Sequence, residues 1–202
     1  MKEIINVGLK TRTVDFTKAD AELLAVGIFA DGKLDKLCAE LNGKLDGQIE
    51  HLIKLGDFTG KTGGSAIIYT NNKIAAKRLL LIGLGEPKKA TLDTARKAAA
   101  QAANKAVGIK AKTLALALHK AFGAGLDLSH IGQAVAEGVY YGSYRYDEYI
   151  TEKEDVRLDS LAVELIDPDS AKTKKLDKGL DSGIIIGKAQ SSARTISNRP
   201  AT

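Results

Sequence analysis

The class of fold is indicated most clearly by residues Lys77–Gly108, KRLLLIGLGEPKKATLDTARKAAAQAANKAVG. This segment opens with an apolar run that closes on Gly83 and Gly85, which predicts a buried strand followed by a tight turn. Thr91 then begins the clearest helix in the chain, and Gly108 ends it. One face of that helix carries small apolar residues, namely Leu92, Ala95, Ala99, Ala102, Ala103 and Ala106. Such a smooth face is suited to lying close on a sheet.

The same alternation of apolar runs and amphipathic segments continues on both sides. The further predicted strands are residues 4–9, 22–30, 66–70, 112–119 and 160–166. The further predicted helices are residues 31–43, 45–55, 127–149 and a last one from about 168–170 into the closing motif. In the first of these, Asp31 is the expected N-cap and Gly43 the expected stop, with Leu34, Leu37, Cys38 and Leu41 on one face.

Strands and helices in this order predict an α/β fold, in three layers, with a sheet covered by helices on both faces. The expected hairpin turn at Asn71 and Asn72 makes the sheet mixed, although mostly parallel. The sequence becomes polar, with a helical pattern, from about Asp167. We therefore predict an α/β domain over residues 1–166 and a linking segment over residues 167–202.

Composition restricts the classes of function. The 202 residues are 44% hydrophobic, and a single cysteine, Cys38, excludes an intrachain disulfide and a cysteine-based zinc cluster. We see no signal peptide, and no apolar run approaches the ~18 residues of a membrane span. These features predict a cytoplasmic protein with no membrane partner. The net charge of +5 is scattered along the chain, so we interpret it as solvated faces and do not expect a nucleic-acid partner.

The sequence contains few candidates for catalytic, cofactor-binding or metal-binding residues. His51, His119 and His130 each stand alone, outside any metal-ligand or HExxH spacing. Gly83 and Gly85 follow a strand and precede a helix, but Lys88 stands where a dinucleotide loop needs its third glycine. The letters GKT within residues 60–65 precede a strand, where a P-loop precedes a helix. The residues alone therefore indicate no catalytic residue, no cofactor-binding residue and no metal ligand.

Tyrosines form the most unusual cluster. Five of the six occur in YYGSYRYDEY, at Tyr140, Tyr141, Tyr144, Tyr146 and Tyr149. Phenol rings pack with an apolar body and a polar tip. Two interpretations stay open: a recognition surface, or a helix end that docks on a neighbouring domain or subunit, which we favour.

Four stretches in order resemble the N-terminal domain of the M17 leucyl aminopeptidase (cytosol aminopeptidase) family. They are FTGKTGGSAIIYT, KRLLLIGLGEPKKATLDTARKAAA, AEGVYYGSYRYDEY and ARTISNRPAT, which together cover most of residues 58–202. The chain departs from the family pattern at Ser197, where an aliphatic residue is usual, and at Thr202, where an asparagine is usual.

The resemblance implies a non-catalytic accessory role. It makes residues 171–198 the linking helix, and Arg199–Pro200 the start of the path into a peptidase domain that this chain lacks. In the family that domain binds peptide substrates and two divalent metals (Zn or Mn), which activate the attacking water. The implied partners are the chain's own C-terminal catalytic domain and further copies in a hexamer. The implied activity, removal of N-terminal amino acids from peptides, belongs to the whole protein, and we expect residues 1–202 alone to be inactive.

Two alternatives remain. The family's N-terminal fold also resembles a macro domain, and macro domains bind ADP-ribose through glycine-rich loops after strands. Gly83, Gly85, Gly123 and Gly125 are the glycines that would serve such a site. A DNA-binding accessory domain is the third class, since a family relative binds DNA through this region.

Overall fold

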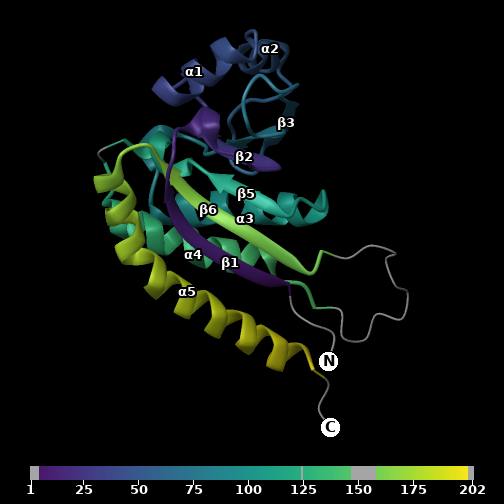
Figure 1. Ribbon diagram of the computed structural model, residues 1–202, viewed down its shortest axis with the longest axis vertical. Helices are drawn as coiled ribbons and strands as arrows, with labels where there is room; N and C mark the ends of the chain where they lie inside the picture. The colour runs from purple at the N-terminus through teal and green to yellow at the C-terminus, as the bar shows by residue number, and fades with distance from the viewer. Residues whose placement is uncertain (1–4, 124, 147–157, 200–202) are drawn as a thin grey trace.

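The computed structural model describes residues 5–123, 125–146 and 158–199, and these form a single six-stranded sheet with helices on both faces (Figure 1). The strands are β1 (Asn6–Thr13), β2 (Leu23–Ile28), β3 (Ser65–Tyr69), β4 (Arg78–Gly83), β5 (Thr113–Leu116) and β6 (Ser160–Asp167). The α-helices are α1 (Lys36–Lys44), α2 (Gln48–Leu55), α3 (Leu92–Gly108), α4 (Leu128–Ser143) and α5 (Ser170–Asn198). Short 3-10 helices are η1 (Phe16–Lys18), η2 (Pro87–Lys89) and η3 (Leu118–Phe122).

The strand order is β1-β6-β5-β2-β4-β3. All neighbouring strands run parallel except the edge strand β3, which is antiparallel to β4. The turn between them holds Asn71 and Asn72, both in the left-handed region with φ of 49° and 62°. Asparagine tolerates that conformation better than most residues do. The prediction of a mixed, mostly parallel sheet is therefore confirmed.

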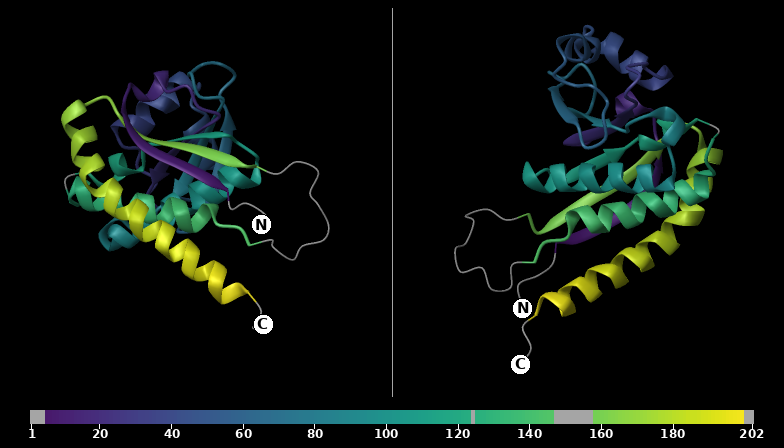
Figure 2. Two further views of the ribbon diagram at one scale, coloured as in Figure 1. Left: turned by 60° about the horizontal axis from the view of Figure 1, so that its bottom comes forward. Right: turned by 180° about the vertical axis from the view of Figure 1, so that it is seen from behind.

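Side chains alternate between two hydrophobic cores, one on each face of the sheet. On β4, Leu80 and Ile82 belong to the core under α3, α4 and α5, whereas Leu79 and Leu81 belong to the core under α1 and α2. Figure 2 shows both layers, with α3, α4 and α5 side by side on one face. Because both faces are covered, the central strands are apolar throughout, as expected for a buried parallel sheet.

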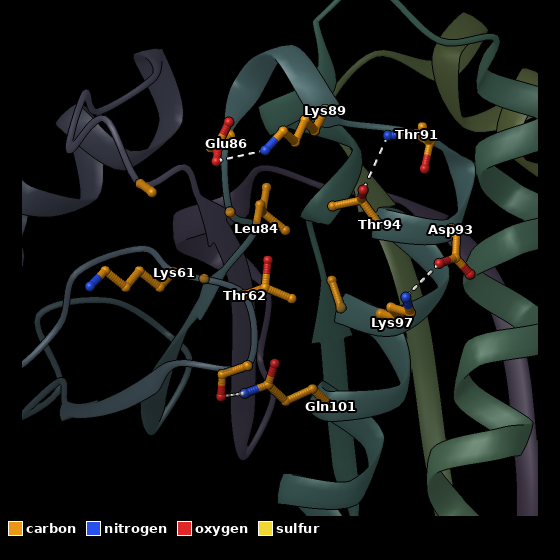
Figure 3. Close-up of a pocket in the computed structure, with 15 residues that line it drawn as sticks. Lys61, Thr62, Leu84, Glu86, Lys89, Thr91, Asp93, Thr94, Lys97 and Gln101 are labelled. Atoms are coloured by element: carbon orange, nitrogen blue, oxygen red, sulfur yellow. Dashed lines mark hydrogen bonds and ion pairs between the residues drawn. The ribbon is translucent and has the colours of Figure 1, made fainter.

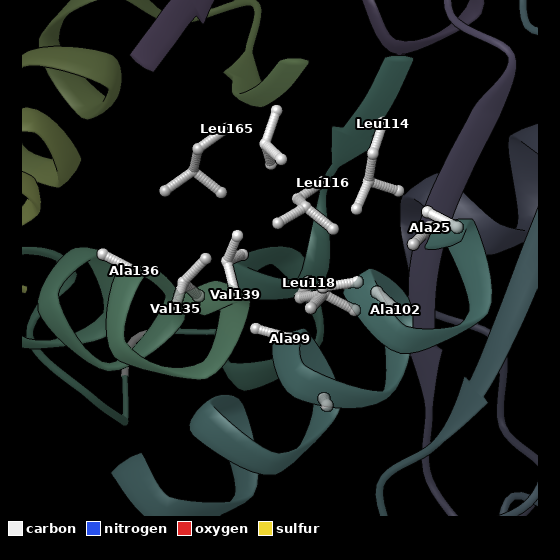
Figure 4. Packing of buried hydrophobic residues seen from close by; sticks show 14 of the residues in the cluster. Ala25, Ala99, Ala102, Leu114, Leu116, Leu118, Val135, Ala136, Val139 and Leu165 are labelled. Carbon is white, nitrogen blue, oxygen red and sulfur yellow. The ribbon is translucent and has the colours of Figure 1, made fainter. Parts of the chain in front are cut away.

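The layer of α3, α4 and α5 packs closely because small residues lie where the helices cross. A Cβ atom at Gly138 of α4 would overlap the carbonyl oxygen of Arg96 on α3. A Cβ atom at Gly179 of α5 would likewise overlap the carbonyl oxygen of Ser129 on α4. Figure 4 shows Ala99 of α3 among the side chains of this core. The alanine-rich face of α3 is buried in one core with sheet residues, as predicted, and close packing also joins the three helices.

The predicted N-cap of the first helix is wrong. Helix α1 begins at Lys36, and the side chain of Asp35 accepts a hydrogen bond from the amide of Cys38 at 2.7 Å. Asp31 instead accepts from the amide of Lys33, and Gly32 follows it with a φ of 69°. Asp-Gly is a turn signal, so this pair makes a turn before the helix. The helix also continues one residue past the predicted stop at Gly43.

Several predicted elements are too long, and in two of them the excess includes a residue singled out in the sequence. Strand β5 ends at Leu116 and η3 follows, so His119 lies on a 3-10 helix. Helix α4 ends at Ser143, and Tyr144 has extended backbone angles. The rest of the predicted helix, residues 147–149, lies outside the described residues, as do the predicted first strand residue at position 4 and the closing residues 200–202.

The last helix, α5, is part of the packed layer over its first half. Leu176 and Leu180 are buried in the core under α3, α4 and α5. Asp169 caps the helix by accepting from the amides of Ala171 and Lys172. Figure 1 shows the last turns of α5 continuing past the strands toward the C-terminus.

Candidate functional site

The connections after β2 and β4 leave the sheet on opposite faces. The chain leaves β2 for α1 and α2 on one face, and leaves β4 for α3 on the other. Adjacent parallel strands with this arrangement form a crevice at their carboxyl ends, the usual ligand position in open α/β sheets. We therefore take this edge of the sheet as the candidate site.

A cleft of about 800 Å³ lies at that edge (Figure 3). It is lined by Ala30 after β2, by residues 61–63, by residues 83–86 at the end of β4, and by the first turns of α3. Both glycine-rich stretches singled out in the sequence therefore line one cleft. Gly123 and Gly125 do not follow a strand directly, because η3 separates them from β5.

The glycines at the end of β4 are explained by the chain's own neighbouring loop. A Cβ atom at Gly83 would overlap the carbonyl oxygen of Lys61, and one at Gly85 would overlap the hydroxyl of Thr62. The amide of Gly83 donates to Gly64 at 2.9 Å, and the amide of Gly85 donates to Gly60 at 2.9 Å. A phosphate loop needs such amides to point at the ligand. Here they are used inside the protein.

Four of the charged side chains that line the cleft contact one another in pairs. Lys89 pairs with Glu86 at 2.9 Å, and Lys97 pairs with Asp93 at 2.7 Å. The hydrogen bond from Lys97 is the main reason that the pKa of Asp93 lies below its ordinary value. Gln101 of α3 donates to the carbonyl of Gly63, on the loop across the cleft, at 2.8 Å (Figure 3). The cleft is thus a mixed-charge surface in which most polar groups are committed to internal contacts.

One buried polar pair lies outside the cleft. The Nε2 atom of His119 is 2.8 Å from a carboxylate oxygen of Asp167, and both side chains are almost fully buried. The other carboxylate oxygen accepts from the amide of Asp169, and Nζ of Lys120 lies 3.6 Å from the oxygen that contacts His119. The pair therefore joins η3 after β5 to the end of β6, just before α5.

The protonation of this pair follows from its surroundings. Burial lowers the pKa of His119 and outweighs the opposing effect of Asp167. Burial alone would raise the pKa of Asp167, but hydrogen bonds from His119 and from the amide of Asp169 hold it below its ordinary value. A neutral imidazole thus donates from Nε2 to an ionised carboxylate. Its Nδ1 atom is buried without a hydrogen-bond partner among the described residues.

The described tyrosines pack mainly within this chain. Tyr140 donates to the carbonyl of Val7 on β1 at 3.3 Å. The hydroxyl of Tyr144 lies 3.2 Å from that of Thr195 on α5. The guanidinium of Arg194 lies over the rings of Tyr141 and Tyr144, at 4.6 and 4.1 Å from their centres. The end of α4 therefore docks on the chain's own last helix, and Tyr149 lies outside the described residues.

Several of the scattered basic side chains lie beside acidic ones in space. Lys77 pairs with Glu22 at 3.2 Å, and Lys89 with Glu86. In the described part of the chain, no group of three or more histidine, cysteine, aspartate or glutamate side chains could hold a metal ion. Within the same ranges, no helix combines the length and the apolar character that crossing a bilayer requires.

Two features went unnoticed in the sequence. His119 and Asp167 are 48 residues apart and carry no local signal of their contact. Gly179, Gly183 and Gly187 recur every four residues on α5, which is a visible signal for a close helix crossing.

Solved structures with the same fold fall into two groups. A mutant of tomato leucine aminopeptidase has a TM-score of 0.72 at 22% identity, covering 98% of this chain and 39% of that one. The bottromycin maturation enzyme BotP has a TM-score of 0.61 at 26% identity, covering 89% and 32%. A Trypanosoma brucei macrodomain has a TM-score of 0.58 at 10% identity, covering 87% and 69%. The sheet, the cleft and these likenesses define a macrodomain-like, three-layer α/β domain.

Sequence relatives identify the family. Residues 25–153 match the N-terminal domain of the cytosol aminopeptidase family, and the chain therefore belongs to that family. A probable cytosol aminopeptidase of Alkaliphilus oremlandii is 29% identical over 90% of this chain and 36% of its own length. One of a Cyanothece species is 34% identical over 73% of this chain and 29% of its own length. The chain thus spans about a third of the curated relatives that it matches.

Proposed function

We propose that this chain is the non-catalytic N-terminal domain of a dimetal leucyl aminopeptidase, and that its own role is to assemble and support the catalytic part. The observation that carries the proposal is the match of residues 25–153 to the N-terminal domain of the family. The whole protein would act in the cytoplasm, removing N-terminal amino acids from peptides. The peptide substrates would bind to the catalytic part.

The metal chemistry belongs, on this proposal, to the part that follows in the longer protein. BotP, a relative by structure, was solved in complex with Mn. The described residues of this chain offer no cluster of three potential ligands. We therefore assign no catalytic residue and no metal ligand here, and we place both expected Zn or Mn ions outside residues 1–202.

A supporting role suits the rigid layer of α3, α4 and α5. Glycine and alanine at the crossings bring three helices into backbone contact, so α5 is held firmly against the sheet over its first half. We propose that residues 167–202 link the α/β domain of residues 1–166 to the catalytic part. The first half of this segment is packed on the domain, which would fix the direction in which the link leaves.

Assembly can be tested directly on the longer protein. We expect the full-length protein to form a hexamer, and a version without residues 1–169 to form smaller assemblies. Sedimentation velocity would measure both. An unchanged hexamer after the deletion would contradict the assembly role.

Nucleotide binding is a second candidate, favoured by the cleft at the carboxyl ends of β2 and β4. The Trypanosoma macrodomain with this fold was solved in complex with ADP. Against it stand the amides of Gly83 and Gly85, which already donate to the chain's own carbonyls. Titration calorimetry with ADP-ribose separates the candidates: our proposal predicts no saturable heat, and saturation would support the nucleotide site.

A further inference from the structure

Helix α5 changes character halfway along its exposed side. In its first half the outward stripe carries Lys174, Lys178 and Asp181, all exposed. Continuing at helical spacing, the same stripe then carries Ile185, Ala189, Ser192 and Ile196, which are also exposed. Charged positions on the stripe therefore give way to uncharged, largely apolar ones, with the exposed Lys188 at the border of the stripe.

The apolar half is well exposed. Ile185 and Ile196 keep 69% and 70% of their surface accessible, and Ile186 and Ala193 lie beside the stripe and are exposed as well. The opposite side of these turns is held by the chain itself, since Arg194 covers Tyr144 and Gly187 contacts Tyr140. The helix thus presents its isoleucines outward from a fixed position.

We infer that this stripe, together with Ile186 and Ala193 beside it, is the surface on which the catalytic part of the longer protein docks. The inference rests on the proposed function, because it takes the catalytic part to be the occupant. It adds the docking surface on this chain and the chemistry of the partner's surface. That surface would be an apolar patch with no buried charge facing the stripe.

The size of the stripe favours a tethered occupant over a second copy of the chain. Its exposed side chains offer a few hundred Å² of apolar surface, below the ~800 Å² per partner of a stable interface. A small patch suffices when the partner is joined covalently, because tethering gives an effective concentration on the order of mM. The curated relatives continue well beyond the matched third, and the stripe runs along the end of the helix nearest to that continuation.

Thiol labelling tests the inference cleanly. The native Cys38 is buried, so it contributes little background. Ile196→Cys and Ile185→Cys place a reporter on the stripe. Leu55→Cys is the matched control, since Leu55 is 61% exposed on α2, across the sheet from α5. Each variant is made in the 202-residue chain and in the full-length protein, and labelled with a maleimide.

We expect both stripe cysteines to react more than tenfold more slowly in the full-length protein than in the 202-residue chain, with the Leu55→Cys rate unchanged. Equal rates at the stripe would overturn the inference. Shielding that already occurs in the 202-residue chain and grows with its concentration would also overturn it, in favour of a second copy. Peptidase activity of the same full-length preparation reports the proposed function separately. An active protein with fully reactive stripe cysteines would refute the docking surface alone.

Discussion

The guanidinium of Arg194 lies 4.1 Å from the centre of the Tyr144 ring, which joins the second half of α5 to the end of α4. The same guanidinium donates to the carbonyl of Tyr141 at 3.2 Å. This contact holds the buried Tyr144 against α5, whereas Tyr141 stays half exposed. It also holds the part of α5 that presents the isoleucine stripe.

Removing the cation should loosen that end of the helix. We expect Arg194→Ala to speed hydrogen exchange in residues 188–198 and to lower the free energy of unfolding by about 1 kcal/mol. Lys188→Ala, an exposed change on the same helix, is the control and should alter neither quantity. If the two variants show the same hydrogen exchange, the stacking of Arg194 on Tyr144 does not hold the helix.

The crossing of α5 and α4 should tolerate no larger residue. Gly179→Ala forces a methyl group against the carbonyl oxygen of Ser129, so we expect a loss of about 1–3 kcal/mol despite the better helix propensity of alanine. Gly43→Ala on α1, where a Cβ would meet nothing within 4 Å, should instead gain about 0.5 kcal/mol. Urea unfolding of both variants measures the contrast. Equal effects would show that the crossing is not tight.

The buried His119 should make the fold sensitive to mild acid. Its pKa is below the ordinary 6.5 in the folded chain, so the unfolded state binds the proton first as pH falls. The stability is therefore complete above pH 6.5 and declines below it, by at most about 1.4 kcal/mol per pH unit, until the folded pKa is reached. The pKa of Asp167 is also lowered. This carboxyl therefore reduces the stability further only when the pH falls below its ordinary pKa of 3.8.

Urea unfolding between pH 4.5 and 7.5 checks this sign. His119→Gln should flatten the dependence of the free energy of unfolding on pH below pH 6.5, although it lowers that free energy overall. His51→Gln, an exposed change on α2, should leave the slope as it is. A slope that survives in His119→Gln would assign it to other groups.

Cys38 should be unreactive in the native state. It is buried in the core under α1 and α2, and this burial, with the nearby Asp35 carboxylate, raises the pKa of its thiol. Because the thiolate is the reactive form, we expect negligible labelling by a disulfide reagent in buffer and complete labelling in urea. Rapid labelling in buffer would contradict the packing of α1.

Local signals in the sequence predicted much of the fold. Thr91 is predictable as the start of α3 because the capping residue and the alanine face lie close together in the sequence. The hairpin at Asn71 and Asn72 followed from turn chemistry. The prediction of Asp31 as N-cap is wrong because Gly32 turns the chain there, and Asp35, which is an equally good capping residue, precedes the helix.

Tertiary contacts set the remainder. Tyr144 leaves α4 and contacts Thr195, 51 residues away, so no local pattern marks the end of that helix. The glycines at the end of β4 were noticed in the sequence, but only the structure shows that the loop of Lys61 and Thr62 fills the space beside them. A glycine that faces a ligand and one that faces its own chain look alike in sequence.

On our proposal, residues 1–202 support catalysis that is carried out elsewhere in a longer protein. The most direct measurement is the hydrolysis of leucine p-nitroanilide by the purified 202-residue chain with Mn²⁺ or Zn²⁺ added, beside the full-length protein under the same conditions. We predict no hydrolysis above background for the 202-residue chain and metal-dependent hydrolysis for the full-length protein. Metal-dependent hydrolysis by the 202-residue chain alone would contradict the account.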